Sequence, residues 1–438
     1  MAAYAIAGSA LIRACEAGRP ENYPENRKNM ICGTTPILRI LFFNFIPPPI
    51  DRIDRIHRID HIHHIEHILI MTFQPVFDLK RPILIAGPCS AENEDQVMAA
   101  ARGLKNQGVD LFRAGIWKPR TRPGAFEGAG MPGLRWLKRV REETGIPVTT
   151  EVANAQHVYD CLKFGIDVFW IGARTTVNPF FMQEIADALE GTDIPVLVKN
   201  PVNPDYKLWV GALERLYKAG LRRIAAIHRG FSSYGDSKYR NVPRWQMAID
   251  LMQEFPGLEV ICDISHICGR RDILAETAQK AYDLNFDGLM IEVHPNPDQA
   301  WSDAAQQITP EGYCQLVQSL VRRAVTTDDP DFLARMENCR NEIDDIDEEI
   351  IHLVARRMNL VKEIGAIKKE KNVAVLQPER FRALREALQR RGEKNELSPE
   401  FIALFLEAVH QESINQQEQI INANTPRKTV PGNLWKAD

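Results

Sequence analysis

Four side chains that can bind a metal ion are spread along the middle of the chain. They are one thiol, one imidazole and two carboxylates: Cys89, His266, Glu292 and Asp303. Sulfur, nitrogen and oxygen donors in this mixture suit a divalent ion such as Zn, Fe, Mn or Co. Each of them alone would more commonly be structural, and residues this far apart in sequence do not establish a site by spacing. We therefore expect one divalent ion, of open identity, if the fold brings the four together.

A second set of candidate residues is basic. It comprises four arginines and two lysines: Arg113, Lys118, Arg120, Arg174, Lys199 and Arg229. Six cations in one place would repel one another unless anions shared the space, and the planar fork of arginine suits phosphate and carboxylate groups. Solvated surface charge is a common explanation for one arginine but a poor one for six. The set indicates small-molecule substrates that carry more than one anionic group.

The elements that would position these residues alternate along the chain. Short apolar runs, expected to be strands, occupy residues 83–88, 111–116, 146–152, 166–173, 195–200, 223–230, 258–265 and 288–294. Amphipathic, helix-like segments lie between them, for example at 133–145, 178–191 and 270–285. Eight such units over about 240 residues predict an α/β fold of the (β/α)8 barrel type.

A barrel of this type collects its chemistry at the carboxyl ends of the strands. Cys89 follows the first expected strand, Arg113 lies in the second, Lys199 ends the fifth and Glu292 ends the eighth. The basic set and the metal-ligand set are therefore expected to meet at one mouth of the barrel.

The composition narrows the class of protein and its partners. The chain is 45% hydrophobic and 26% charged, as is typical of a globular enzyme, and its net charge of −4 gives no reason to expect nucleic acid. Its apolar runs are all too short to span a membrane. Eight cysteines without a C-x-x-C pair indicate reduced thiols and a cytoplasmic location.

The stretch at 51–70, DRIDRIHRIDHIHHIEHILI, raises a different possibility. It holds five of the eleven histidines, and its isoleucines from Ile53 to Ile68 recur strictly every three residues. A period of three drifts about 60° per repeat around a helix and does not match the alternation of a strand, so it builds no apolar face. A histidine-rich metal-binding protein is one alternative. We favour an unstructured extension over residues 1–70, with Met71 as the effective start and no part in the chemistry.

Seven segments carry a family resemblance. They read, in chain order, GPCSAEN, FRAGIWKPRTRPGAFEG, WIGART, VLVKNP, HRGFSSY, DISHICGRRD and IEVHPNPDQAWSD. Together they resemble the motif series of the 3-deoxy-7-phosphoheptulonate synthases, in the short class I form that shares its barrel with the 3-deoxy-octulosonate 8-phosphate synthases. The resemblance covers roughly residues 74–325 and implies condensation of phosphoenolpyruvate with erythrose 4-phosphate.

The resemblance also assigns roles to individual residues. It implies that phosphoenolpyruvate is held by Arg113, Lys118, Arg174, Lys199 and Arg229. Arg120 and Thr121, within KPRT, would face erythrose 4-phosphate, and the KPRT run favours this sugar over arabinose 5-phosphate. Cys89, His266, Glu292 and Asp303 match the metal ligands of the family. Lys118 and His294 are candidates for proton transfer or water handling. An octulosonate-type synthase with a helical regulatory domain is the alternative enzyme.

After residue 327 the pattern becomes that of a long helix. An apolar seam with spacings of three and four comprises Met336, Cys339, Ile343, Ile346, Ile350, Leu353, Leu360, Ile364 and Ile367. Arg357 takes one position on this seam, and a buried charge needs a partner, so we expect a bound anion. Lys368 lies three turns further on the same face, whereas Arg340 points about 100° away and could serve a site in a second chain.

The remaining helices are too few to build a core alone, so an intertwined homodimer or a higher homo-oligomer is expected. In the last of them Ser413 and Gln417 are four apart and share a face. On spacing alone, a dimerisation helix with an incidental arginine remains an equal alternative to an anion site.

Residues 332–420 resemble the all-helical chorismate mutase family. The resemblance rests on ENCRNEIDDIDEEIIHLVARRMNLVKEIGAIK, QPERF and HQESINQQ. It implies that Arg357 and Arg380 bind chorismate within one chain while Arg340 reaches in from the partner. Lys368 and Gln417 would hydrogen-bond the ether oxygen of the breaking bond, and Ser413 would bind a carboxylate.

Two positions depart from the mutase pattern. Gln377 and Phe381 stand where many mutases have acidic residues near the substrate hydroxyl. A mainly regulatory domain is therefore the alternative, although the other site residues are kept and favour an active mutase. The expected organisation is an extension at 1–70, a barrel at 71–327, a helical mutase domain at 328–422 and a disordered tail at 423–438.

Overall fold

The computed structural model describes residues 71–77, 79, 82–118, 124 and 126–423. The predictions for residues 1–70 and for the tail beyond residue 423 lie outside these ranges. The contacts within the chain define two compact units, and the boundary between them in the sequence lies between Val321 and Arg322. Each unit is described by itself. No helix of the described residues is long and apolar enough to cross a membrane.

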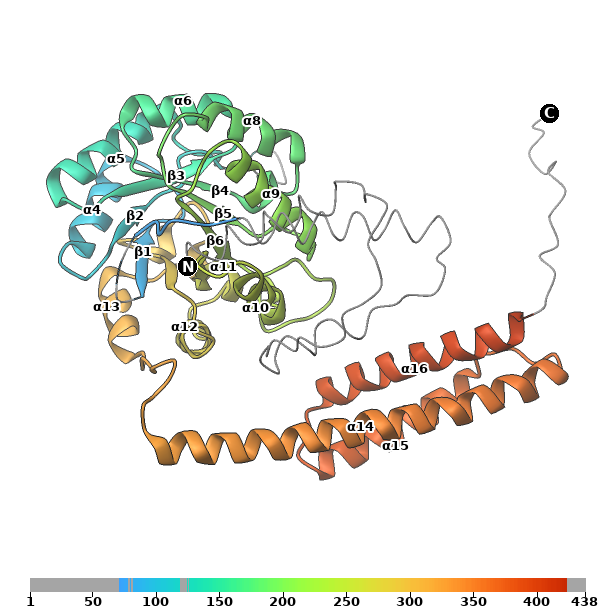
Figure 1. The fold of residues 1–438 in the computed structure, drawn as a ribbon. Coiled ribbons are helices and arrows are strands. Elements are labelled where there is room, and N and C mark those ends of the chain that lie inside the picture. Colours follow the sequence, from blue (N-terminus) through green and yellow to red (C-terminus); the bar gives the residue numbers. More distant parts are fainter. Residues whose placement is uncertain (1–70, 78, 80–81, 119–123, 125, 424–438) are drawn as a thin grey trace, which may run out of the picture. The chain divides into compact units, whose positions relative to one another are not determined.

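The first unit is a closed barrel of eight parallel strands whose spatial order follows the chain (Figure 1). The strands are β1 (Ile83–Gly87), β2 (Leu111–Arg113), β3 (Val148–Val152), β4 (Val168–Ile171), β5 (Val196–Lys199), β6 (Ile224–His228), β7 (Glu259–Asp263) and β8 (Gly288–Glu292). Every β1 residue pairs with one of β8, from Ile83 with Gly288 to Gly87 with Glu292, which closes the barrel. The predicted (β/α)8 fold is confirmed.

Helices surround the barrel on its outside (Figure 1). The main ones are α4 (Glu94–Leu104), α5 (Met131–Thr144), α6 (Ala155–Phe164), α8 (Pro179–Leu189), α9 (Tyr206–Lys218), α10 (Trp245–Glu254), α12 (Leu274–Asp283) and α13 (Pro310–Ser319). Short helices follow the fourth, seventh and eighth strands: α7 (Ala173–Thr176), α11 (Ile264–Cys268), η1 (Pro297–Gln299) and η2 (Ala304–Gln306). These short elements lie on the side of the barrel where the candidate residues were expected.

Alternation along the strands separates two cores. Ile85, Trp170 and Ile261 belong to a cluster that fills the interior of the barrel. Their neighbours, such as Ala86 and Val260, belong to the larger cluster between strands and helices. Because both faces of each strand are covered, the strands read as nearly continuous apolar runs, which is why the sequence revealed them.

Aspartates at the amino ends of the strands fix the register of neighbouring strands. Asp110, just before β2, accepts a hydrogen bond from the backbone N–H of Leu84 in β1. Asp287, just before β8, accepts one from Val260 in β7. This end of the barrel therefore uses its carboxylates for stability and leaves the opposite end for chemistry.

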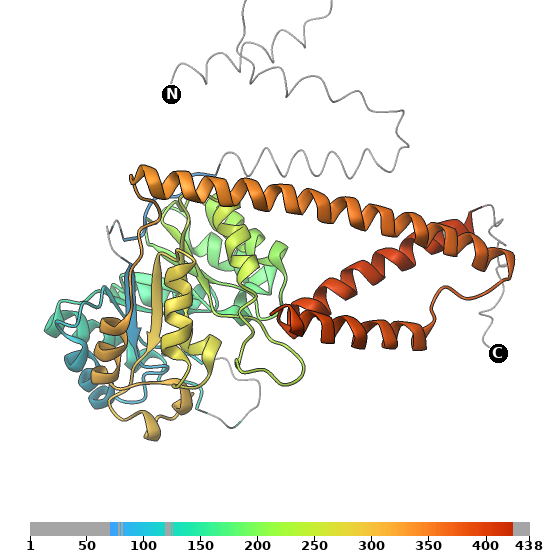
Figure 2. The ribbon, with the colours of Figure 1, turned by 90° about the horizontal axis from the view of Figure 1, so that it is seen from below.

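The second unit consists of three helices. They are α14 (Pro330–Glu370), α15 (Pro378–Lys394) and α16 (Pro399–Asn422). The first turns of α14 extend beyond the ends of the other two helices (Figures 1 and 2). Proline at the first turn and an aspartate or serine cap start two of them: Asp329 accepts from Phe332 N–H, and Ser398 accepts from Phe401 N–H.

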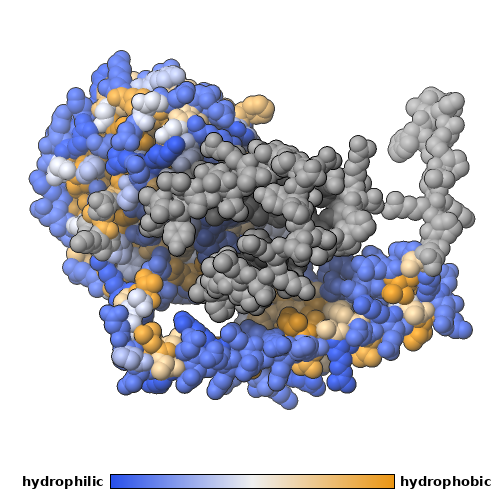
Figure 3. All heavy atoms as spheres, in the orientation of Figure 1, coloured by the Kyte–Doolittle hydropathy of each residue, from blue (hydrophilic) through white to orange (hydrophobic). Residues whose placement is uncertain are grey.

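The apolar core of the helical unit is small. Met358 and Val361 of α14 and Ile402 and Leu406 of α16 are its buried apolar side chains among the described residues. The predicted seam of α14 instead remains exposed from Met336 to Ile367. Its large apolar side chains are 37–63% exposed, and Cys339 is exposed as well. Apolar residues accordingly show at the surface of this unit (Figure 3).

Candidate active sites

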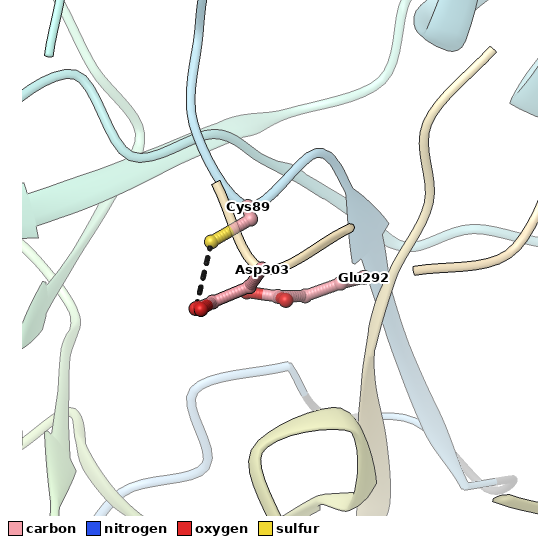
Figure 4. A group of neighbouring side chains, drawn as sticks. All are labelled: Cys89, Glu292 and Asp303. Atoms are coloured by element: carbon pink, nitrogen blue, oxygen red, sulfur yellow. Dashed lines mark hydrogen bonds between the residues drawn. The ribbon is translucent and has the colours of Figure 1, made fainter. Parts of the chain in front are cut away.

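Three of the four predicted metal ligands gather at the carboxyl end of the barrel. Ligand atoms of Cys89, Glu292 and Asp303 all lie within 4.8 Å of one another, and the three side chains converge (Figure 4). Pairing of β1 with β8 brings the ends of these strands together, with Cys89 two residues beyond β1 and Glu292 the last residue of β8. Asp303 precedes η2 in a left-handed conformation, with φ of 50°, and its Oδ2 lies 3.4 Å from the Cys89 sulfur.

The fourth predicted ligand, His266, lies next to these three. Its Nε2 is 3.6 Å from Oε1 of Glu292, and its Nδ1 is 2.8 Å from Oδ2 of Asp263. A carboxylate behind an imidazole is the usual arrangement around metal-binding histidines, because it fixes the ring and its tautomer. Asp263, the last residue of β7, was not among the predicted site residues.

The chemistry of this donor set fits a divalent ion. Gln306 donates a 2.7 Å hydrogen bond to Oε2 of Glu292. The buried Oε1 has no hydrogen-bond donor among the described residues, although an Arg113 guanidinium nitrogen lies 3.2 Å away. An ion would satisfy that oxygen. Burial and the neighbouring Glu292 raise the pKa of the Cys89 thiol to about 12. A cation among these ligands would favour the thiolate instead.

Two predicted cations directly adjoin the acidic cluster. Arg113 is 1% exposed; its Nη2 donates to the carbonyl oxygen of Cys89 at 3.1 Å, and its guanidinium lies 4.8 Å above the Trp170 ring. Lys118 Nζ lies 3.0 Å from the Cys89 sulfur and 3.1 Å from its carbonyl oxygen. Burial alone would lower the pKa of Lys118, but Cys89 and Glu292 outweigh it and raise that pKa.

Lys199 and Asp263 form a second buried pair. Lys199 Nζ lies 2.8 Å from Oδ2 of Asp263, the oxygen that also contacts His266. Burial alone would raise the pKa of Asp263, but His266 and Lys199 outweigh it and hold that pKa well below its usual range. The ionised carboxylate therefore links the basic set to the metal-ligand set.

Three arginines of the site, Arg174, Arg229 and Arg240, lie close to one another. The pKa of Arg229 is lowered to about 10, chiefly by burial and also by the neighbouring Arg240 and Arg174, although Asp263 partly offsets these effects. Arg229 is anchored through Asn241, whose Oδ1 accepts from Nη1 at 2.8 Å. Arg240 lies 2.9 Å from Oδ1 of Asp303. Sequence reasoning missed Arg240 because it follows no strand, although it lies only nine residues beyond the HRGF run.

The three remaining predicted residues of the barrel are Arg120, Thr121 and His294. Arg120 and Thr121 lie outside the described residues. His294 is buried; its Nδ1 accepts from the backbone N–H of Asn296 at 2.9 Å, and its Nε2 lies 3.5 Å from Glu92. The contacts of the described residues therefore join Lys118, but not His294, directly to the Cys89 cluster.

In the helical unit, three predicted residues meet between α14 and α16. Arg357 of α14 donates a 2.6 Å hydrogen bond from Nη1 to the Ser413 hydroxyl of α16. Gln417, one turn beyond Ser413, is 8% exposed, and its buried Oε1 has no hydrogen-bond donor within the described part of the chain. Burial lowers the pKa of Arg357. A guanidinium next to a hydroxyl can bind a carboxylate, and an amide oxygen can accept a hydrogen bond from a ligand.

Lys368 lies near the same interface between α14 and α16, at a place where the two backbones come close together. A methyl group on Gly365 would lie 3.3 Å from Cα of Gln417, so α14 and α16 come together at this glycine. Lys368, nearly one turn further, is 9% exposed and donates to the carbonyl oxygen of Val375 at 2.5 Å.

The two other predicted arginines of this unit are exposed. Arg340 lies in the first half of α14, where its nearest acidic neighbour is Glu337 at 3.9 Å. Arg380 lies in the first turn of α15. Neither is joined to Arg357 by a contact within the described residues of this chain.

A cavity of about 330 Å³ opens beside Arg357. One wall is the stack of Phe381 on His410, with ring centroids 3.7 Å apart. The remaining lining is apolar: Ile350, Leu353, Val354, Leu384, Leu388, Phe405, Leu406 and Val409. Sequence reasoning noted Phe381 as a departure but missed His410, since the chain carries no local signal that pairs them. Gln377 caps the start of α15 without a side-chain hydrogen bond.

Comparison with known proteins defines the class of each unit. The model of the DAHP synthetase I family matches residues 78–325, more than half of the chain, so the chain belongs to this family. The model of chorismate mutase type II matches residues 339–418. The chain therefore combines a barrel of the first family with a C-terminal domain of the second.

Individual relatives agree with this assignment for the barrel. A phospho-2-dehydro-3-deoxyheptonate aldolase of Thermotoga maritima is 30% identical over 241 residues, which cover 55% of this chain and 69% of that protein. A 2-dehydro-3-deoxyphosphooctonate aldolase of Syntrophotalea carbinolica is 31% identical over 51% of this chain and 84% of that protein. A crystal structure of the Thermotoga maritima DAHP synthase superposes with a TM-score of 0.51 and 28% identity, covering 57% of this chain and 72% of that one.

Proposed function

We propose that this chain is a bifunctional enzyme of the shikimate pathway. Its barrel condenses phosphoenolpyruvate with erythrose 4-phosphate to 3-deoxy-D-arabino-heptulosonate 7-phosphate, and its helical domain rearranges chorismate to prephenate. The family of each unit supports this pair of reactions. One observation supports it within the site: the Lys118 ammonium lies 3.0 Å from the Cys89 sulfur, where the basic set meets the metal ligands.

The metal-ligand set and the basic set of the barrel would have different roles. Cys89, His266, Glu292 and Asp303 would hold one divalent ion (Mn, Fe, Co or Zn), which when bound supplies Lewis acidity at the aldehyde or activates water. Arg113, Lys118, Arg174, Lys199 and Arg229 would bind the phosphate and carboxylate of phosphoenolpyruvate. Arg120 and Thr121 would face erythrose 4-phosphate.

The condensation needs two polyanions held side by side. C3 of phosphoenolpyruvate attacks the aldehyde carbon, water adds at C2, and phosphate leaves by C–O cleavage. The mutual repulsion of Arg229, Arg240 and Arg174 supports anion binding here, because a bound phosphate would relieve it. Lys118 Nζ would donate a proton close to the reacting atoms. His294 remains the second candidate for handling water.

The choice of sugar is the main alternative. Some relatives are named for the octulosonate reaction, which makes arabinose 5-phosphate a second candidate substrate. The mutase domain in the same chain favours erythrose 4-phosphate, because chorismate lies downstream of its product. The test is condensation by the full chain with each sugar in turn, followed by product mass. Preference for the five-carbon sugar would overturn this proposal.

The helical domain would act by holding its substrate. Arg357 and Arg380 would bind the carboxylates of chorismate, Ser413 would add a hydrogen bond, and Lys368 and Gln417 would bind the ether oxygen. A pericyclic rearrangement needs no nucleophile, so holding the compact conformer and stabilising charge on that oxygen is sufficient. The contact of the Arg357 guanidinium with the Ser413 hydroxyl, between α14 and α16, supports carboxylate binding at this place.

A second copy of the chain would complete this domain. The seam of α14 exposes Ile343, Leu353, Leu360 and other large apolar side chains, which a partner would cover. Arg340 would then reach the site of the partner. We also propose a cytoplasmic location, because the cysteines within the described ranges are all free thiols.

A further inference from the structure

Two short segments of the barrel unit form a neck beside Lys118. The neck consists of residues 116–118 and 127–130. Lys118 N–H donates to the Glu127 carbonyl oxygen at 2.8 Å, and Gly130 N–H donates to the Ile116 carbonyl oxygen at 2.8 Å. Gly128, with φ of 105°, lies so close that a Cβ would come within 2.2 Å of that same Ile116 oxygen. The backbone on either side of the KPRT residues is therefore held together closely.

A ring stack attaches this neck to α6. The Trp117 side chain lies on the His157 imidazole with centroids 3.8 Å apart and planes 4° apart. His157 is itself fixed at the start of α6: its N–H donates to Oδ1 of Asn154 at 2.9 Å, and its Nδ1 accepts from the N–H of Ala153 at 3.3 Å. The imidazole thus presents a fixed face to Trp117.

Lys118, the next residue after Trp117, connects this ring stack to the Cys89 cluster. A cavity of about 220 Å³ adjoins it, lined by Trp117, Lys118, Glu127, Glu151, Ala153 and His157. Because this space borders the Lys118 stem, the residue has room to shift if the stack is lost. A displacement of about 1 Å of a group at the chemistry can cost about 100-fold in rate.

We propose that His157 is a positioning residue for the condensation: its ring, stacked on Trp117, holds the neck so that Lys118 Nζ stays against Cys89. The kinetic part of this inference rests on the proposed function of the barrel. The structural part does not, because it concerns only the neck and the stack.

The test compares three variants of the full chain. His157→Ala removes the ring, His157→Phe keeps a ring face but no acceptor for Ala153, and Tyr159→Ala removes an exposed aromatic residue from the same helix as a control. We expect His157→Ala to lower kcat for the condensation at least about tenfold, with a smaller change in KM for phosphoenolpyruvate. His157→Phe should restore most of the rate, and Tyr159→Ala should match the original chain.

Two further measurements separate positioning from general damage. Chorismate turnover by the same preparations should stay unchanged, which reports on folding and concentration. Amide hydrogen exchange of the peptide that spans the neck should become faster in His157→Ala only. A His157→Ala chain with unaltered condensation and exchange would overturn the inference, and so would a His157→Phe chain as impaired as His157→Ala. If the original chain does not condense erythrose 4-phosphate at all, the proposed function fails and the exchange measurement alone decides the inference.

Discussion

The two units of this chain assemble their sites in opposite ways. In the barrel, contacts from the ends of β1, β2, β5, β7 and β8 bring Cys89, Lys118, Lys199 and Glu292 into one buried network within a single chain. In the helical unit, Arg357 and Ser413 meet, but Arg340 remains exposed and the apolar seam is uncovered. A barrel can close on itself, whereas three helices cannot bury their own seam. The barrel site is therefore expected to work in a monomer and the helical site only in a dimer.

Removing the metal should produce the largest difference between the two units. Chelation, or Cys89→Ala, is expected to lower the condensation rate by about 1,000-fold or more, because the Lewis acidity that the ion would supply to the reaction is lost. Chorismate turnover should be unaffected. Metal content by mass spectrometry and both rates are measured on each sample. Cys314→Ala, away from the cluster, is the matched control, and full condensation by chelated protein would refute the metal site.

Removing Arg357 should produce the converse effect. Arg357→Ala is expected to lower chorismate turnover by about 100- to 1,000-fold, as the loss of one charge-stabilising donor commonly does, while condensation continues. Arg356→Ala, at an exposed neighbouring position on α14, is the control. An unchanged mutase rate for Arg357→Ala would mean that the site lies elsewhere.

Mixing two inactive variants tests whether the helical site is shared between chains. Arg340→Ala and Arg357→Ala should each be inactive as mutases. After unfolding and refolding together, half of the dimers combine both variants and each has one intact site, so about a quarter of the original activity should return. Mixing Arg357→Ala with Arg380→Ala, both proposed to act within one chain, should restore none. No recovery in the first mixture would show that Arg340 does not act across chains.

Acid should weaken the barrel through the buried His228. Burial in a cage of aromatic rings lowers the pKa of His228 to about 3. The unfolded chain binds this proton below about pH 6.5, whereas the folded chain does not, so stability falls as the pH drops from about 6.5 toward 3. At pH 5 this single group costs about 2 kcal/mol of unfolding free energy. Unfolding of the original chain and of His228→Leu at pH 7 and pH 5 measures the difference, with exposed His352→Leu as the control. Equal pH dependence in all three chains would contradict this assignment.

The smallest expected effect is that of the histidine-rich stretch. Deleting residues 1–70 should leave both activities and the metal content unchanged. The isoleucine period of three in this stretch builds no apolar face that could hold metal ligands in place. Loss of metal or of condensation in the shortened chain would show that the stretch takes part in the chemistry.

Much of the barrel could be predicted because its signals are local. Each strand is a buried apolar run, and its last residue lies at the active end, so Cys89 and Glu292 could be expected at the same mouth of the barrel. Arg240 could not, because it follows no strand and reaches Asp303 only through the folded loop. The stacks of Trp117 on His157 and of Phe381 on His410 likewise join residues 40 and 29 positions apart, for which the chain has no local pattern.

The sequence by itself determined the order of the elements, the two families and the type of chemistry, because periodicity and motifs are properties of neighbouring residues. Only the tertiary structure decided which atoms meet. It separated His294, which lies near Glu92, from Lys118, which lies against Cys89, although both follow strands of the same barrel. It also left the α14 seam uncovered within one chain. Such outcomes depend on how side chains from distant elements fill a shared space, which no spacing along the chain records.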